Sequence, residues 1–535
     1  MIVCSSFDHH CIARHWSLNA PLRFELDSHD FPCADVRTVL QESAFCWLIT
    51  ASGNAPLYND YPIVTPAYLL IALRGGCRTM PGTVGPIVEL YDEGDLIVTG
   101  GQDYVRCFTA MRSALSSPFE AILKATDAQD EQFLQRCAAR RAPLRSHPLT
   151  ARVETAVEDA LMMIRAQQHT DGGIQAGHNY HLAYVRDQYG DFRGLLAMGA
   201  WDAARAILEF YRRVFERHGR ICNAQTMGVD GVFHIHENDT SEITGYLLLQ
   251  GTDYLDTVGD DAFFKSLQPM LDWALQAQLE LLRDGMLPFN GDETYIAGGI
   301  IPRNILNHGS FEATLLFITG ARRYIDRCHR LGMENPWLTR AAKQVEAAAQ
   351  RFDAHFRRGD DYVTNAITDS RRAAEPDFRH GVCLSCGSFG WLHHRAEGWY
   401  VCPRCLTVAP APASHREYRL KSTLLMAPYI GATLPEHSLV LDQVRTFLKR
   451  FRNTGNMPSL PDGNTAVGYD YGLLLYAAAS AKIPADDLLE KMLNLQDEAG
   501  AWSEYFEGDT PRKTRCRPWE TAINITGALH YLKQS

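Results

Sequence analysis

The chain has 535 residues, of which 46% are hydrophobic and 21% are charged, as in a water-soluble globular protein with a large core. Its formal net charge of −11 argues against nucleic acid and against an anionic membrane as the main partner, because both are negatively charged. No segment approaches the roughly 18 consecutive apolar residues of a membrane span, and the length suits a large domain plus a smaller one.

The N-terminus and the cysteines indicate the compartment. Residues 1–16 carry His9, His10 and Arg14 and no apolar core, unlike a secretory signal. The chain has 14 cysteines, and those outside one cluster are scattered, which fits a reducing compartment better than a framework of disulfides. We therefore expect a cytoplasmic protein.

The first part of the chain has strand patterns. Apolar residues alternate along 22–26, and Val88–Thr99 predicts a hairpin that turns at Gly94. The segment 117–141 then has helical spacing. We therefore expect a β-rich N-terminal domain with a helical linker over residues 1–145.

From about residue 150 onward the pattern is almost wholly helical. Val153, Val157 and Leu161, for example, fall on one stripe of an amphipathic helix. The predicted helices span 151–167, 187–199, 202–218, 240–256, 260–283, 309–331, 337–357, 417–433, 437–452, 465–481, 484–495 and 519–533.

The connections between these helices alternate in length. Those at 199–201, 258–259 and 483–484 are short. The long ones are 168–186, 219–239, 284–308, 358–416, 453–464 and 496–518. Six helical hairpins with every long loop at one end predict a mainly α chain, an (α/α)6 toroid over residues 146–535. Because functional residues concentrate on loops held by a rigid scaffold, we expect the pocket at that end.

The fourth long loop contains two Cys-x-x-Cys pairs with fifteen residues between them. The four cysteines are Cys383, Cys386, Cys402 and Cys405. Four thiolates at this spacing predict a zinc-ribbon insertion over residues 376–412, whose Zn²⁺ is structural because no coordination position is left for water. Two disulfides or four unrelated thiols are the alternative. We expect the insertion to act as a lid or wall that limits substrate length, or else as an oligomer contact.

The first long loop ends in Tyr184, Arg186 and Asp187 at the predicted start of a helix. An adjacent arginine and aspartate present one donor and one acceptor to neighbouring hydroxyls, and Tyr184 offers an apolar platform. The alternative is that Asp187 only stabilises the helix N-terminus.

The third long loop places two carboxylates side by side after a bend. Asp292 and Glu293 follow Gly291 and lie near Phe289 and Tyr295 in the sequence. Burial against rings and a neighbouring like charge both raise the pKa of a carboxyl, as a general acid requires. Otherwise one or both are surface charges on a turn.

The last long loop carries Glu504 among aromatic residues, with Trp502 before it and Tyr505 after it. Aromatic faces stack on sugar rings, and Trp519 follows at the predicted start of the final helix. Two carboxylates on opposite sides of a pocket suit cleavage of a glycosidic bond. A purely structural aromatic loop is the alternative.

Several of these motifs resemble glucoamylases, the enzymes of glycoside hydrolase family 15. The resemblance covers residue 150 to the end, apart from the cysteine insertion. The similar segments are Tyr184–Asp187, Leu195–Gly199, Glu237–Asp239, Tyr246–Tyr254, Val258–Asp260, Glu504 and Trp519–Ala522. The β-rich N-terminus is also similar to the β-sandwich that precedes the barrel in prokaryotic members.

The resemblance implies an inverting glycosidase that releases glucose from short α-linked glucosides. It gives Glu504 the role of general base and the Asp292–Glu293 pair that of general acid, with Glu293 favoured. Arg186 and Asp187 would grip the sugar at the cleaved end. An inverting mechanism would place the two carboxyls roughly 6.5–9.5 Å apart.

Further sugar contacts implied by the resemblance are Asp239, Trp502 and Trp519. Two departures stand out, because the family has a tryptophan where Gly291 precedes the acid pair, and a small hydroxyl-bearing residue where Glu520 follows Trp519. An oligosaccharide phosphorylase, a lyase, or a non-catalytic sugar-binding or assembly protein are the other hypotheses. A phosphorylase needs no base, so Glu504 favours water as the nucleophile. Whether the chain forms a homo-oligomer stays open.

Overall fold

The computed structural model describes most of the chain. The described residues are 2–6, 11–26, 34–41, 44–51, 67–101, 103–177, 182–227, 233–234, 239–288, 308–333, 336–359, 361–362, 378–382, 389–396, 399–401, 405–410, 424–434, 437–457, 459, 465–512 and 516–534. They divide into two compact units, one of residues 1–136 with 226–233 and one of residues 137–225 with 234–535.

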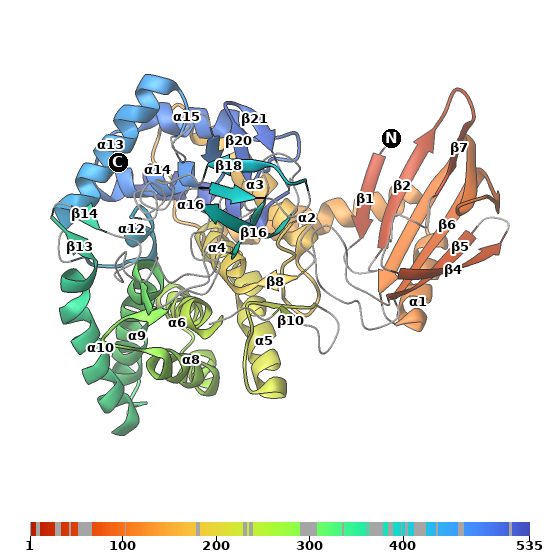
Figure 1. Ribbon diagram of the computed structural model, residues 1–535. Helices are drawn as coiled ribbons and strands as arrows, with labels where there is room; N and C mark the ends of the chain where they lie inside the picture. Colours follow the sequence, from red (N-terminus) through yellow and green to blue (C-terminus); the bar gives the residue numbers. More distant parts are fainter. Residues whose placement is uncertain are drawn as a thin grey trace. The chain divides into compact units, whose positions relative to one another are not determined.

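The N-terminal unit is built on a seven-stranded antiparallel sheet (Figure 1). The strands are β1 (Ile2–Ser6), β2 (Cys11–Ser17), β3 (Leu22–Glu25), β4 (Ala34–Gln41), β5 (Ala44–Ala51), β6 (Ala67–Pro81) and β7 (Pro86–Gly101). Their order is β1-β2-β7-β6-β5-β4, with β3 also pairing β7. Helices α1 (Tyr104–Leu115) and α2 (Phe119–Arg140) follow the sheet in the chain.

The predicted hairpin at Gly94 is wrong, because this segment is part of the single long strand β7. Gly94 lies opposite Gly75 of β6 on one side and Trp16 of β2 on the other. A side chain at position 94 would meet the Trp16 ring at 2.3 Å, so the glycine serves close packing. The turn-like residues mark a register shift instead, where the pairing moves from Gly75–Gly94 to Cys77–Leu90 and leaves the extra residues on β7.

The second unit is a double ring of helices of the (α/α)6 type (Figure 1). Among the described residues, six helices contact one another in a closed ring: α4 (Val185–Met198), α6 (Asp239–Val258), α9 (Phe311–Arg330), α12 (Met426–Ile430), α14 (Asp470–Ser480) and α16 (Pro518–Gln534). The outer helices are α3 (Thr150–Gln167), α5 (Trp201–His218), α8 (Gln268–Leu281), α10 (Pro336–Phe356), α13 (His437–Thr454) and α15 (Asp486–Asn494). The expectation of a mainly α chain is confirmed.

Each inner helix follows a long loop, and the chain returns through an outer helix before the next one. The inner helices therefore run in the same direction, with their N-termini at the end of the ring where the long loops lie. Acidic residues occupy the first turn of α4, α9, α14 and α16 (Asp187, Glu312, Asp470 and Glu520). The helix dipole stabilises negative charge there.

Two predicted helices differ from the observed ones. The span 260–283 is divided at Leu267 into α7 (Asp261–Ser266) and α8, which has a proline in its first turn. The span 465–481 begins as strand β19 (Thr465–Val467), and helix α14 starts only at Asp470. The span 417–433 lies partly outside the described residues, in which α12 is its helical part.

Small residues let the last inner helix approach its neighbours closely. A side chain at Gly194 of α4 would lie 2.6 Å from the Ala522 side chain of α16. A side chain at Gly472 of α14 would lie 2.5 Å from the Asn524 Cα atom. These contacts pack α16 closely against both α4 and α14, which matters for the site described below.

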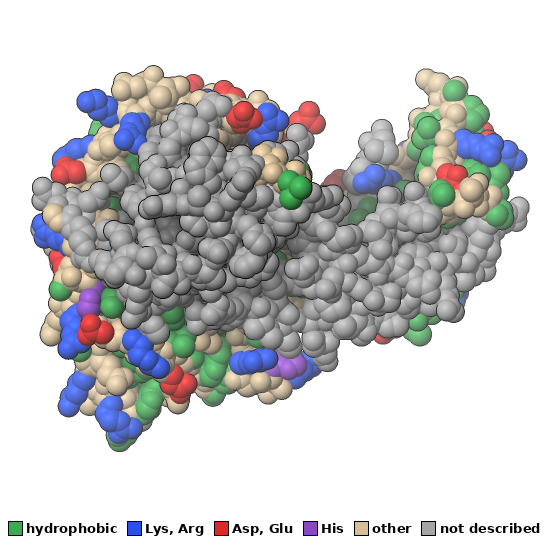
Figure 2. Space-filling view, viewed as in Figure 1, with side chains coloured by type: hydrophobic (Ala, Val, Ile, Leu, Met, Phe, Trp, Pro, Cys, Tyr) green, Lys and Arg blue, Asp and Glu red, His purple; other side chains and the backbone are tan. Residues whose placement is uncertain are grey.

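The described surface of the second unit is mixed in charge, and basic and acidic side chains lie interspersed on the face in Figure 2. Arg322 pairs with Glu346 at 2.7 Å and Arg327 with Asp256 at 2.6 Å. Exposed pairs of this kind contribute at most about 1 kcal/mol each. Within the described ranges, no helix combines the length and apolar character needed to cross a membrane.

Candidate active site

The first long loop ends at α4, where the predicted sugar-binding residues lie. Strand β8 (Ala183–Tyr184) belongs to a three-stranded sheet and fixes the chain just before the helix. Tyr184 is half-buried, whereas Arg186 and Asp187 in the first turn are 6% and 4% exposed. Asp187 pairs with Arg517 of the last long loop, so it does more than stabilise the helix N-terminus.

The last long loop holds Glu504 immediately before strand β20 (Tyr505–Glu507). β20 pairs with β19, and the Gly468 amide donates to the Glu504 carbonyl oxygen at 2.8 Å. A side chain at position 468 would lie 2.0 Å from the Ser503 carbonyl oxygen, so only glycine permits this approach. Glu504 is 2% exposed, and its loop is fixed on both sides.

Two tryptophans support this loop from within. The Trp502 indole N–H donates to the Met492 carbonyl oxygen at 2.8 Å, and its amide donates to Thr521 Oγ1 of α16 at 3.3 Å. The Trp519 ring lies edge-on to Tyr469 at 5.5 Å. Both rings are buried against the protein, and a sugar-stacking role for either stays a prediction.

Arg517 joins the first and the last long loops. Its Nε donates to Glu520 Oε2 at 2.9 Å, and its Nη2 lies 3.1 Å from Asp187 Oδ1. Its Nη1 donates to the Ala176 carbonyl oxygen at 2.6 Å. One buried guanidinium thus connects α16, α4 and the loop that precedes α4.

Two carboxyls near Arg517, those of Glu520 and Asp191, have raised pKa values. Burial raises the pKa of Glu520 to about 7; Arg517 opposes this rise, and the charges of Glu504 and Asp187 add to it. Burial also raises the pKa of Asp191, one turn after Asp187, well above its ordinary value. Among the described residues neither Asp191 oxygen has a hydrogen-bond partner. Burial therefore favours the protonated form of Asp191, and Glu520 titrates near neutral pH.

The predicted acid pair, Asp292 and Glu293, lies outside the described residues. The chain leaves the described structure after strand β11 (Leu287–Pro288) and returns at β12 (His308–Ser310), which pairs with it. The Leu287 amide donates to Thr314 Oγ1 in the first turn of α9, so both ends of the loop are fixed beside that helix.

Asp239, the remaining predicted sugar contact, is the first residue of α6, and its side chain lies outside the described part. It therefore starts an inner helix, as Asp187 lies in the first turn of another. Whether it contacts a sugar stays a prediction.

No protein-family model and no curated protein sequence matches the chain. Among solved structures, it is similar to a bacterial glucoamylase complexed with acarbose, with a TM-score of 0.59 and 11% identity over 100% of this chain and 81% of that one. It is also similar to the glucoamylase from Saccharomycopsis fibuligera, with a TM-score of 0.50 and 10% identity over 73% of this chain and 97% of that one. The chain has the glucoamylase fold.

The two Cys-x-x-Cys pairs lie in the fourth long loop. Cys383, Cys386 and Cys402 lie outside the described residues, and Cys405 is exposed with its Sγ 3.2 Å from Thr407 Oγ1. The insertion contains a four-stranded antiparallel sheet of β15 (Phe378–Val382), β16 (Phe389–Ala396), β17 (Trp399–Val401) and β18 (Val408–Pro410).

Each of the two Cys-x-x-Cys pairs begins directly after a strand of this sheet. β15 and β17 both run antiparallel to β16 and therefore run in the same direction, with Val382 opposite Phe389 and Val401 opposite His393. Cys383 follows one of these strands and Cys402 follows the other. Within the described parts of the chain, no three metal-binding side chains gather at one point.

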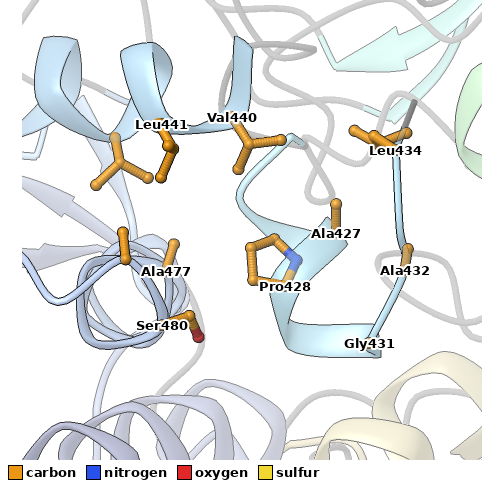
Figure 3. A pocket seen from close by; sticks show the side chains of 11 residues that line it. Ala427, Pro428, Gly431, Ala432, Leu434, Val440, Leu441, Ala477 and Ser480 are labelled. Carbon is orange, nitrogen blue, oxygen red and sulfur yellow. The ribbon is translucent and has the colours of Figure 1, made fainter. Parts of the chain in front are cut away.

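A small cavity of about 250 Å³ lies away from these residues (Figure 3). Pro428 of α12, Val440 and Leu441 of α13, and Ala477 and Ser480 of α14 line it. It lies at the C-terminal ends of α12 and α14, whereas the candidate site lies at the N-termini of the inner helices. The cavity is therefore separate from the candidate site.

The sequence pattern did not identify Arg517 or Asp191. A single arginine before Pro518 has no periodic partner, and Asp191 lies in an amphipathic helix like many other polar residues. A possible signal was Arg517 directly before a helix N-terminus, where a cation is unfavourable unless acidic groups surround it.

Proposed function

We propose that the chain is an inverting glycoside hydrolase that releases glucose from short α-linked glucosides. The observation that carries this proposal is that the first and the last long loops are connected at one end of the inner ring. Arg186 and Asp187 begin α4, Glu504 precedes β20, and Arg517 connects their supports. All four side chains are almost completely buried, and charges in such a low-dielectric environment act strongly on a bound group.

Each residue has a role that its chemistry supports. The Arg186 guanidinium donates hydrogen bonds and the Asp187 carboxylate accepts them, so together they fit adjacent sugar hydroxyls. Glu504 acts as general base and removes a proton from a water molecule, whose oxygen attacks the anomeric carbon. The bond to the leaving oxygen breaks as the general acid protonates it, and the anomeric configuration is inverted.

Glu293 is our candidate for the general acid, with Asp292 as the alternative. Support comes from the ends of their loop, because β11 and β12 pair beside the N-terminus of α9, an inner helix. The loop therefore begins and ends on the same side of the ring as Asp187 and Glu504. The glucoamylase fold of the chain is consistent with this pair of carboxylates.

We further propose a structural Zn²⁺ held by Cys383, Cys386, Cys402 and Cys405. The four-stranded sheet supports it, because the strands before the two cysteine pairs, β15 and β17, flank β16 and run in the same direction. Four thiolates supply a closed tetrahedral site without a position for a reacting water. The scattered remaining cysteines support a reducing, cytoplasmic location.

The proposed hydrolysis is tested by glucose release from a panel of α-linked gluco-disaccharides and maltotriose, in the absence of phosphate. We expect Glu504→Gln to lower kcat by roughly 10²–10⁴-fold, because the general base is lost while the size of the side chain is kept. The matched control is Glu507→Gln, an exposed glutamate of the same strand that pairs with Arg512.

Proton NMR of the first product identifies the anomer, and the β-anomer of glucose indicates inversion. Equal activity of wild type and Glu504→Gln would refute the base assignment. No glucose release by the wild type, or release only with phosphate, would refute the hydrolase.

A further inference from the structure

The Arg517 side chain contacts three separate parts of the second unit. Its contacts are with Glu520 in the first turn of α16, Asp187 in the first turn of α4, and the Ala176 carbonyl oxygen in the first long loop. The side chain of Arg517 is 4% exposed, and those of Asp187 and Glu520 are 6% and 1% exposed. This is a buried, bifurcated ion pair between two inner helices.

Fold stability alone does not account for this arrangement. A buried ion pair loses solvation of both charges, and apolar residues of similar size are often equally stabilising. The cation also lies next to a helix N-terminus, where the dipole disfavours it. Arg517 is tolerated there because two acidic first turns, those of α4 and α16, face it.

The backbone around Arg517 fixes its direction. Cys516 has φ of +50°, a left-handed conformation that non-glycine residues rarely adopt. Pro518 is the first residue of α16, and it restricts the backbone of the preceding residue to extended conformations. The Arg517 carbonyl oxygen accepts the first bond of α16, from the Thr521 amide at 3.1 Å. The backbone at Arg517 is therefore constrained on both sides, and its side-chain contacts hold the guanidinium in place.

We propose that Arg517 is a positioning residue for the proposed hydrolysis, which orients the sugar-binding carboxylate of Asp187 and fixes it to the helix that supports the base loop. This inference rests on the proposed function. Because Nη2 holds Oδ1 of Asp187, the carboxylate cannot rotate without breaking that pair, so the direction of its other oxygen is set. The same guanidinium holds Glu520, one residue before Thr521, which accepts a bond from the base loop.

The contacts of Arg517 with Asp187 and Glu520 also explain how two loops distant in the sequence keep a defined spacing. The first long loop supplies the grip on the sugar, the last one supplies the base, and Arg517 contacts both supports. A displacement of about 1 Å at such a site lowers the rate by around 100-fold. A residue with this role acts through Asp187 and need not touch the sugar.

A double-mutant cycle tests the proposal on the full chain. The variants are Arg517→Gln, Asp187→Asn and the two combined, and the control is Arg512→Gln, an exposed arginine of the same loop that pairs with Glu507. The affinity for glucose is measured by calorimetry, which needs no turnover, and kcat and KM are measured for the best disaccharide. Circular dichroism verifies that each variant is folded, and Arg517→Lys replaces Arg517→Gln in the cycle if the latter does not fold.

We expect Arg517→Gln to weaken glucose binding roughly tenfold or more and Arg512→Gln to leave it unchanged, since only the former contacts Asp187. The combined variant should bind glucose within about twofold of Asp187→Asn alone, because Arg517 acts through that residue. Multiplicative losses in the combined variant, or an unchanged affinity in Arg517→Gln, would overturn the proposal. Wild type that binds glucose but hydrolyses no glucoside overturns only the hydrolase. Wild type that binds no sugar overturns both.

Discussion

Arg517 is buried and Arg193 is largely buried in the ring of inner helices, but their charges are balanced in different ways. Arg517, at the N-terminal end, faces the carboxyls of Asp187 and Glu520. Arg193, farther along α4, lies 4.4 Å from the Tyr429 ring centre and 5.9 Å from that of Tyr476. It donates to the Tyr429 carbonyl oxygen, and its nearest carboxylate oxygen, on Asp253, is 3.7 Å away.

The two regions differ in whether their charge changes near neutral pH. Around Arg517 the partners include Glu520, whose pKa burial raises to about 7, so the local charge changes near neutral pH. Around Arg193 the partners are mainly rings and a carbonyl, with the Asp253 carboxylate 3.7 Å away, and burial lowers the pKa of nearby His530 to about 4, which keeps it neutral at higher pH. The middle of the ring thus serves stability at all ordinary pH values, whereas the loop end can respond to protons.

The largest expected effect tests the middle of the ring. Arg193→Met should lower the free energy of unfolding by about 3–5 kcal/mol, because it removes cation–π contacts and leaves a buried carbonyl without its donor. Urea unfolding at pH 7 measures this loss. The control Arg322→Met removes an exposed arginine paired with Glu346 and should cost less than about 1 kcal/mol. Equal losses in both variants would contradict a structural role for Arg193.

The next effect concerns the loop end and its dependence on pH. The folded-state pKa of Glu520, about 7, lies above its ordinary value of 4.5. Between these two values the folded chain holds a proton that the unfolded chain releases, so wild-type stability falls as pH rises. Glu520→Gln removes this dependence. The stability of the variant relative to wild type should therefore rise by roughly 3 kcal/mol between pH 4.5 and 8.

Thermal or urea unfolding across that pH range measures the difference. Glu507→Gln, at an exposed glutamate in the same loop, should show no such trend. If the stability difference between Glu520→Gln and wild type does not change with pH, the Glu520 carboxyl has the same pKa in the folded and unfolded chains. The two buried arginines would then not differ in their response to protons.

Sequence patterns predicted the helices well because they depend on local spacing. The span 202–218 corresponds to α5 (Trp201–His218), which ends at Gly219 in a left-handed conformation. Glycines at such ends signal where a helix stops. The hairpin at Gly94 was wrong for a related reason, since glycine there allows close packing against Trp16 and does not form a turn.

The site was predictable only in part. Arg186 and Asp187 stand together in the sequence, and Glu504 is marked by its aromatic neighbours, so local patterns were enough to make them candidates. Arg517 became visible only when the fold brought it to Asp187, because long-range ion pairs leave no spacing in the sequence. The same holds for Asp191, whose raised pKa comes from burial and from the charge of a neighbour one turn away.

The smallest expected effect on the stability of the helical ring comes from loss of zinc in the fourth long loop. A four-stranded sheet of this size is too small for a core of its own, so bound Zn²⁺ would stabilise it locally. Elemental analysis should find about one zinc per chain in wild type and none in Cys402→Ser/Cys405→Ser. Cys77→Ser, a half-buried cysteine of β6, is the control that should keep the metal. Zinc retained by the double variant would contradict the four-cysteine site.

Loss of this zinc should change the unfolding free energy of the barrel by less than about 1 kcal/mol, because a structural zinc site contributes mainly to its own module. If the insertion is a lid or wall, hydrolysis of disaccharides stays unchanged while longer substrates gain relative to short ones. An unchanged preference would exclude the lid, and a changed oligomeric state in the variant would identify the insertion as a contact between chains. A barrel that unfolds with the insertion would instead show that the fourth loop is as important to the ring as Arg193.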